Sequence, residues 1–349
     1  MSPQRLQNAD GAKSFSDVDV IMPAFNAERT ISQALQSILD QTCQPARVIV
    51  VDDGSTDATR DIVYGISRKN PGVELVRQVN AGPATARNAA IDRCRSQFVA
   101  PIDADDMWDR DYLERQMTQL AANPGVAFSY SGHRILDDQS GTTRDAHNLA
   151  IEGNAWLAMV LHNFVGNGSS MVFRRELANA AGGYREPLSH FHGGEDYFFQ
   201  LSLLQRGPVT CVNRVMVTYR AHDRSLSKNN RKMLDARVAA IRASIRGGQN
   251  ADLRALARVS RWARADAARV YAVQCIDGGH GLEALRYGMT ALAADVPGTL
   301  SDLRQRIRNL TSRSFGTLES MPSKIDPLLL RRLEILAEKG DFTVSVKCN

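Results

Sequence analysis

The 349-residue sequence contains no apolar run long enough to span a bilayer, so it predicts no transmembrane helix. Its five cysteines are scattered and fit neither a zinc-site spacing nor a disulfide framework, so we expect reduced thiols and a cytoplasmic protein. Residues 1–16 are polar and lack the apolar core of a signal peptide, and we expect a disordered lead there. Because aromatic residues make up only 6% of the chain and no reader motif is present, we predict no nucleic-acid partner.

The net charge of +5 is unevenly distributed along the chain. Residues 226–349 hold 21 Lys and Arg against 12 Asp and Glu, whereas residues 1–225 hold 22 against 26. The acidic first part suggests a metal site, and the basic second part suggests that an anionic surface lies near it.

Strand and helix signals alternate from residue 17 to residue 227, which predicts one α/β unit. The expected buried strands are 19–22, 47–51, 73–78 and 97–102, followed by strands near 126–130, 133–136, 168–173 and 209–219. Helices are expected after a cap at Asn26, after Thr56 or Asp57, and over 83–94, 110–122, 153–163 and 195–206. This order predicts a Rossmann-like, mostly parallel sheet with helices on both faces.

From residue 228 onward the strand signals stop, and we expect an α-helical C-terminal region over 228–349. The expected helices cover 228–274, 282–294, 300–310 and 327–339. The segment 226–269 carries 11 Lys and Arg against 3 Asp and Glu. One interpretation is that these helices lie on an anionic membrane or hold a lipid-linked acceptor. The other is that their basic face is solvated while they pack on the first unit or form a homodimer contact. We favour the packing interpretation.

The segment Asp103-Ala104-Asp105-Asp106 directly follows the expected strand 97–102. In open α/β sheets, ligands bind at the carboxyl ends of the strands. Residues two apart on a strand point the same way, so Asp103 and Asp105 are placed to serve one divalent cation. Hard carboxylate oxygens suit Mg or Mn, although a solvated Asp-rich turn is the alternative for the segment taken alone.

Polar loops also follow the other three strands of the first half, and all four are expected at one edge of the sheet. They are Pro23-Ala24-Phe25-Asn26, Asp52-Asp53-Gly54-Ser55 and Asn80-Ala81-Gly82. Asp53 is a candidate acceptor for a uracil N–H or a ribose hydroxyl, with an Asp-Gly turn as its alternative. Arg87, one turn into the helix after Gly82, either reaches a phosphate or braces the Asp103 loop.

These four loops, taken in order, resemble those of the family 2 inverting glycosyltransferases with the GT-A fold. Two later segments are similar to family motifs as well, namely Gly193-Gly194-Glu195-Asp196 and Tyr219-Arg220-Xaa-His222. The resemblance covers about residues 17–227 and leaves 228–349 uncovered. It implies a GT-A catalytic domain that uses a nucleoside-diphosphate sugar.

The resemblance also implies roles for individual residues. Donor-nucleotide contacts are expected from Pro23, Phe25, Asn26, Asp53, Asn80, Gly82, Arg87, Asp103 and Ala104. Asp105 and His222 would hold Mn or Mg, Asp196 would be the catalytic base, and Glu195, Trp108 and Gly168 would lie on the acceptor or sugar side. Several of these have plainer alternatives: Trp108 as a core residue, His222 as a bystander, Gly168 as part of a flexible turn, and Glu195-Asp196 as a helix start.

The expected function is therefore metal-dependent, inverting transfer of a sugar, with a UDP-sugar favoured as donor, to a hydroxyl of a sugar or lipid-linked glycan. The resemblance implies a role in surface polysaccharide or glycolipid assembly. We expect a cytoplasmic protein, with peripheral association at the inner face of the cell membrane as the alternative that the basic segment leaves open. An inactive sugar-nucleotide-binding protein is the alternative, and it would lack Asp105 or Asp196, both of which are present. A sugar nucleotidyltransferase would need a Gly-rich triphosphate loop near the first strand, which Pro23-Ala24-Phe25-Asn26 does not provide.

Overall fold

The computed structural model describes most of the first 247 residues and parts of the remainder. The described residues are 6–7, 13–14, 17–146, 149–188, 192–222, 230–247, single positions between 259 and 276, 281–295, 327–337 and 342–345. Among them, no helix has the length and apolar character needed to cross a bilayer.

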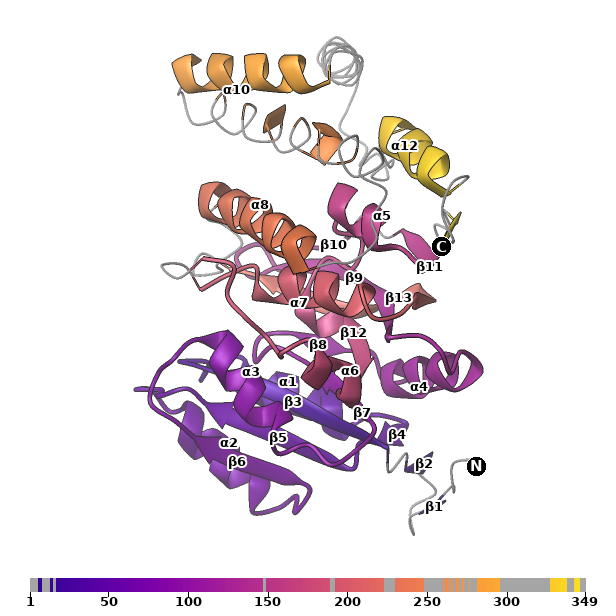
Figure 1. The fold of residues 1–349 in the computed structure, drawn as a ribbon. Coiled ribbons are helices and arrows are strands. Elements are labelled where there is room, and N and C mark those ends of the chain that lie inside the picture. Colours follow the sequence, from indigo (N-terminus) through magenta and orange to yellow (C-terminus); the bar gives the residue numbers. More distant parts are fainter. Residues whose placement is uncertain are drawn as a thin grey trace.

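The described strands form a central 11-stranded sheet and a small 3-stranded one. The central order is β14-β11-β13-β9-β12-β7-β3-β5-β6, with β10 paired to β9 and β8 paired to β13 (Figure 1). Strands β7 (Phe98–Pro101), β3 (Val18–Ala24), β5 (Arg47–Asp52) and β6 (Val73–Arg77) are mutually parallel. The expected parallel sheet is thus confirmed for the first half, and the carboxyl ends of its strands share one edge.

The later strands join this parallel part in both directions. They are β8 (Met107–Trp108), β9 (Phe128–Asp137), β10 (Thr143–Asp145), β11 (Ala150–Gly153), β12 (Met171–Arg174) and β13 (Val209–Ala221). Strand β12 runs antiparallel to both β7 and β9, whereas β13 runs parallel to β9. The second half therefore makes the sheet mixed.

Helices cover both faces of the parallel strands, because alternate residues of each strand face opposite cores. Ile21 and Ile49 lie in a core with α3 (Pro83–Ile91). Val20 and Val50 lie in a second core with α1 (Ile31–Leu39), α2 (Thr59–Ser67) and α4 (Tyr112–Ala122). Strands that are buried on both faces have continuous apolar sequences, and these strands show that pattern.

Some boundaries differ from the sequence prediction. Helix α1 begins at Ile31 after Thr30, so Asn26 is not its cap, and Asn26 has a positive φ of 49°. The two strands expected near 126–136 are one strand, β9. The start of the strand expected over 168–173 is a 3₁₀ turn, Gly168–Ser170.

The remaining helices of the first unit are short, apart from α7. Helix α5 spans Trp156–Leu161, α6 spans Arg175–Ala180, and α7 spans Glu195–Leu204. Nearly every residue of α7 is buried, because the sheet lies on one side of it and the C-terminal region on the other (Figure 1).

The C-terminal region contains the expected helices α8 (Asn230–Gly247), α10 (Gly281–Ala294) and α12 (Pro327–Ala337). The expectation that no strand follows residue 228 is wrong, because β14 (Phe342–Ser345) pairs antiparallel with β11 at the edge of the central sheet. The alternating, β-branched sequence Phe-Thr-Val-Ser is the signal for this strand. The helix expected over 300–310 lies outside the described residues.

Four residues of the N-terminal lead are described, and they are paired rather than irregular. Strand β1 (Leu6–Gln7) pairs with β2 (Lys13–Ser14), and β2 runs parallel to β4 (Cys43–Gln44). The expectation of disorder therefore does not hold for these four residues, and the rest of 1–16 lies outside the described residues.

Candidate active site

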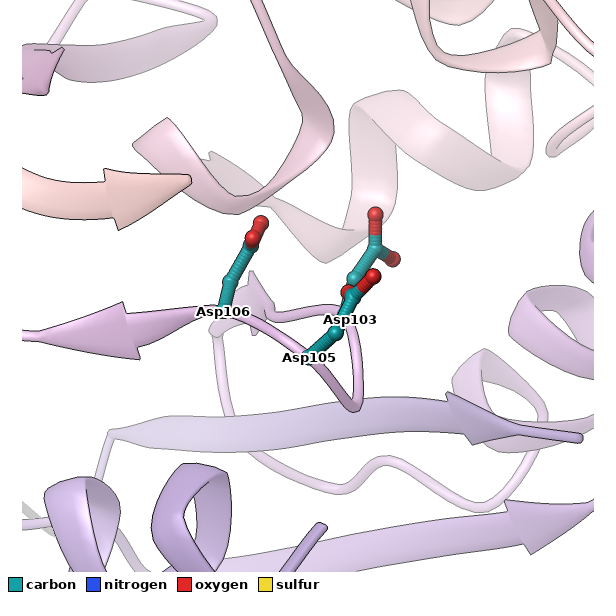
Figure 2. A group of neighbouring side chains, drawn as sticks. All are labelled: Asp103, Asp105 and Asp106. Carbon is teal, nitrogen blue, oxygen red and sulfur yellow. The ribbon is translucent and has the colours of Figure 1, made fainter. Parts of the chain in front are cut away.

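Three carboxylates gather in the turn after β7. One oxygen from each of Asp103, Asp105 and Asp106 lies within 4.8 Å of the others (Figure 2). They lie at the edge of the sheet because the chain turns there, directly after the fully buried strand Phe98–Pro101. Such oxygens are ligands that Mg²⁺ and Mn²⁺ prefer.

The three carboxylates are not equivalent. Asp106 is buried and accepts hydrogen bonds from the Ser169 hydroxyl at 2.5 Å and from the backbone N–H of Arg220 at 3.1 Å. Asp105 is partly exposed, and its Oδ2 lies 3.0 Å from Nε2 of His222. Asp105 and His222 are therefore together, as the sequence predicted, and remain accessible to a ligand.

Burial raises the pKa of both Asp103 and Asp106, and repulsion from the Asp105 carboxylate raises both further. Arg87 opposes the shift at Asp103. Clustered carboxylates with this environment are stabilised by a bound cation, so the residues present fit a divalent metal.

Arg220 holds the carboxylate turn in place, a role that the sequence reasoning missed. Its guanidinium donates to the backbone oxygen of Asp105 at 3.2 Å, to Asp138 at 2.7 Å and to Gln33 at 2.7 Å. Asp106 was likewise given no role of its own by the sequence prediction. The available signals were the position of Asp106 in the acidic segment and that of Arg220 two residues before His222.

Arg87 connects the carboxylate turn to helix α7. Its side chain is buried, with Nη2 2.5 Å from Asp103 and Nη1 2.6 Å from Glu195. The guanidinium also lies 5.3 Å from the centre of the Tyr184 ring. Of the two alternatives for Arg87, the structure favours the brace.

Helix α7 begins with Glu195 and Asp196 directly after Gly194, which has a left-handed φ of 79°. Glu195 is buried against Arg87, whereas Asp196 is half-buried and accepts a hydrogen bond from the backbone N–H of Tyr197. Burial raises the pKa of Asp196 to about 7, with a further rise from the Glu195 carboxylate and an opposing effect of Arg87. A carboxylate with a pKa near 7 suits proton transfer at neutral pH.

The predicted acceptor-side residues have different surroundings in the structure. Gly168 lies beside the base candidate, since a Cβ on it would be 3.6 Å from Cβ of Asp196. Trp108 is buried, donates to the backbone oxygen of Ser169 at 2.8 Å and stacks on Tyr112. The structure therefore favours a core role for Trp108 over contact with a sugar.

Asp53 organises the donor-side loops. Its Oδ1 accepts hydrogen bonds from Gln78 at 2.7 Å and from the backbone N–H of Ala81 at 2.9 Å, and its Oδ2 accepts one from Gly82 at 2.9 Å. Each carboxylate oxygen has two acceptor positions, so Oδ2 retains capacity for a ligand.

The remaining predicted donor residues lie around these loops. The Asn26 side chain accepts a bond from the backbone N–H of Thr56 at 2.9 Å and so ties the first loop to the second. Phe25 and Asn80 are exposed, Pro23 is partly buried within β3, and Ala104 is buried in the carboxylate turn. The structure thus brings all the predicted donor loops to one edge of the sheet.

Comparison with known proteins identifies the family. The model for "Glycosyl transferase family 2" matches residues 19–181. The UDP-Glc:alpha-D-GlcNAc-diphosphoundecaprenol beta-1,3-glucosyltransferase WfgD of Escherichia coli is 31% identical over 219 residues, covering 62% of this chain and 82% of WfgD. The chain belongs to glycosyltransferase family 2.

Solved structures show that this family 2 chain has the GT-A fold. TarS 1-349 of S. aureus, in complex with UDP-GlcNAc, superposes with a TM-score of 0.58 at 16% identity, covering 80% of this chain and 81% of that one. The mannosyltransferase PcManGT of Pyrobaculum calidifontis, in complex with GDP-Man and Mn2+, gives 0.56 at 20% identity, covering 93% and 86%.

The family match ends at residue 181, before α7, yet the C-terminal region packs directly against α7. A Cβ on Gly194 would lie 3.1 Å from Cβ of Ala236 in α8. From the same helix, Arg237 donates to the backbone oxygen of Leu161 at 2.8 Å and lies over the Tyr197 ring. Helix α8, in the basic segment, therefore packs on the first unit, as the favoured interpretation predicted.

The raised pKa of Asp196 predicts a pH-dependent cost in stability. Because the folded state holds the Asp196 proton up to about pH 7 and the unfolded state releases it near pH 4, stability falls as pH rises between these values. Asp196→Asn removes this loss. We expect its stability relative to the native chain to increase by about 2 kcal/mol between pH 5 and pH 8.

Urea unfolding in EDTA at the two pH values measures this difference. The exposed Asp61→Asn, on helix α2, is the matched control and should show no such change with pH. A constant difference between Asp196→Asn and the native chain would contradict the burial of this charge.

Proposed function

We propose that this family 2 glycosyltransferase transfers a sugar from a UDP-sugar to an acceptor hydroxyl with inversion at the anomeric carbon. One observation carries the proposal: Arg87 bridges Asp103 in the carboxylate turn and Glu195 at the start of α7. This bridge brings the carboxylate oxygens of the turn, which are of the kind that binds divalent metals, close to the half-buried Asp196. The donor's phosphates would be held at the first and its reacting carbon near the second.

The donor loops supply the nucleotide side of the proposed site. Phe25 offers an exposed ring at the end of β3, and Asp53 keeps acceptor capacity at Oδ2. The favoured base is uracil, because TarS 1-349 was solved with UDP-GlcNAc and the name of WfgD specifies UDP-Glc. PcManGT was solved with GDP-Man, so a guanine nucleotide is the comparison ligand.

Asp105 and His222 would hold Mg or Mn, with Asp103 and Asp106 behind them. A divalent ion bound there would neutralise the charge of the departing diphosphate. Arg220 keeps the Asp105 backbone in position through its bond to the Asp105 carbonyl oxygen. The Ser169 hydroxyl holds the Asp106 side chain through its hydrogen bond to Oδ2.

Asp196 is the proposed general base. It would accept the proton of the acceptor hydroxyl as that oxygen attacks the face opposite the diphosphate, which inverts the configuration. With a pKa of about 7, Asp196 is largely ionised at slightly alkaline pH and still basic enough to take the proton. Gly168 lies beside Asp196 and has no side chain, so no Cβ stands next to the proposed base.

We further assign residues 17–227 to the catalytic domain and 228–349 to a C-terminal region that supports α7. A lipid-linked glycan is the favoured acceptor, because the name of WfgD specifies a diphosphoundecaprenol acceptor. Action on such an acceptor fits a role in surface polysaccharide assembly and the basic character of residues 226–269.

Slow hydrolysis of the donor tests the stereochemistry without knowledge of the acceptor, since water then replaces the acceptor hydroxyl. Proton NMR at early times, with Mn²⁺ replaced by Mg²⁺ to avoid paramagnetic broadening, should show the β-anomer of glucose appearing first from α-linked UDP-glucose. Initial appearance of the α-anomer would contradict inversion.

A further inference from the structure

A histidine and glutamate pair lies just before the catalytic helix and is not used by the proposed mechanism. Nδ1 of His192 lies 2.5 Å from Oε1 of Glu186. The His192 side chain is 56% exposed, whereas that of Glu186 is 18% exposed. The carboxylate thus anchors an imidazole whose ring is open to solvent and ligands.

The ring lies against the donor side of the site, at the start of helix α3. A Cβ on Gly82 would be 2.6 Å from Nδ1 of His192 and 2.9 Å from Oε1 of Glu186. The absence of a side chain at Gly82, which also has a positive φ of 88°, is what lets the pair approach. The backbone N–H of Gly82 is the one that donates to Asp53.

The pair therefore stands between two parts of the proposed site. On one side, Gly82 and Asp53 belong to the donor-nucleotide loops. On the other, the chain continues from His192 through Gly193 and Gly194 to Glu195 and Asp196. A donor that spans from the nucleotide loops to Asp196 would place its diphosphate, and the sugar joined to it, between these two parts.

We propose that Nε2 of His192 makes a hydrogen bond to a hydroxyl of the transferred sugar and so contributes to the choice of donor sugar. The inference rests on the proposed function. Nδ1 faces Glu186, so Nε2 is the ring nitrogen that is left for a ligand. The Glu186 carboxylate next to the ring disfavours an anionic group there, which argues for a neutral hydroxyl over the diphosphate.

Comparison of UDP with UDP-sugars isolates this contact, because UDP lacks the sugar. Calorimetric titrations of UDP, UDP-glucose and UDP-GlcNAc in Mn²⁺ would be made on the native chain, His192→Ala and Glu186→Ala. Loss of one hydrogen bond should weaken the binding of at least one UDP-sugar about tenfold in His192→Ala, while UDP stays within about twofold. Glu186→Ala should show the same selective loss in smaller degree, because the ring keeps Nε2 but loses its anchor.

Glu176→Gln, an exposed glutamate of α6, is the control for a charge change and should leave all three affinities unchanged. If His192→Ala weakened the binding of UDP and of the UDP-sugars equally, or weakened neither, this inference would be overturned and the proposed function would stand. A native chain that binds neither UDP nor a UDP-sugar would overturn the proposed function together with the inference.

Discussion

Asp196→Asn should lower kcat by at least about 100-fold while donor affinity stays close to that of the native chain. The amide cannot accept the proton of the acceptor hydroxyl, and loss of a positioned base costs 10²- to 10⁴-fold. The side chain keeps its size and its bond from the Tyr197 N–H, so the start of α7 should be undisturbed. Donor turnover and calorimetric donor affinity, measured on the same preparation, check the two halves of this expectation.

The pH dependence sharpens this prediction. In the native chain kcat/KM should rise with pH through an acidic limb near 7, because Asp196 must be ionised to act as a base. Asp61→Asn should keep both the rate and the acidic limb, since Asp61 is an exposed residue of α2 and does not belong to the carboxylate turn or to the start of α7. A near-native rate in Asp196→Asn would mean that another group is the base.

The strand-end loops could be predicted from the sequence because buried parallel strands leave a clear pattern. Residues 48–51 and 98–102 are apolar runs, and each is followed at once by an acidic residue. Parallel strands place such ends at one edge, so Asp53 and Asp105 were expected to share a crevice without knowledge of any contact. The two hydrophobic cores of the first half could be predicted from the same alternation of strand and helix.

The partners of individual side chains could not be predicted, because long-range packing selects them. Arg87 contacts Asp103, 16 residues away, and Glu195, 108 residues away. Ser169 reaches Asp106 across 63 residues. The local pattern left both interpretations of Arg87 open, and only its ion pairs with Asp103 and Glu195 favour the brace.

The C-terminal strand β14 was missed for a related reason. Its four residues follow a long helical stretch, and a short edge strand is defined by the strand it pairs with, here β11. Trp108 had two open interpretations, a sugar contact and a core role, which the local sequence pattern could not separate. Its position after the acidic residues suggested a sugar contact, but its indole nitrogen is taken by the backbone of Ser169 inside the core.

Asp105→Ala should reduce donor affinity in Mn²⁺ to the value measured in EDTA, a loss of about 100-fold or more. Asp105 is a partly exposed carboxylate of the turn, and its partner, His222, has a ring nitrogen of the kind that binds metals. Changes to residues that merely support a metal ligand cost 10- to 100-fold, so removing a ligand should reach the upper end. Calorimetry of UDP-glucose with the variant, with and without Mn²⁺, measures it.

Asp145→Asn, an exposed residue of β10, is the control and should keep the native affinity in Mn²⁺. If Asp105→Ala still showed tighter donor binding in Mn²⁺ than in EDTA, the metal would be held elsewhere.

The titration of the native chain with UDP-glucose, UDP-GlcNAc and GDP-mannose, each in Mn²⁺ and in EDTA, tests the central claim most directly. The claim is that the carboxylate turn binds a nucleotide sugar through a divalent cation. It predicts saturable binding of a UDP-sugar in Mn²⁺ and loss of that binding in EDTA. Binding of equal strength in EDTA, or no binding of any of the three donors in Mn²⁺, would contradict it.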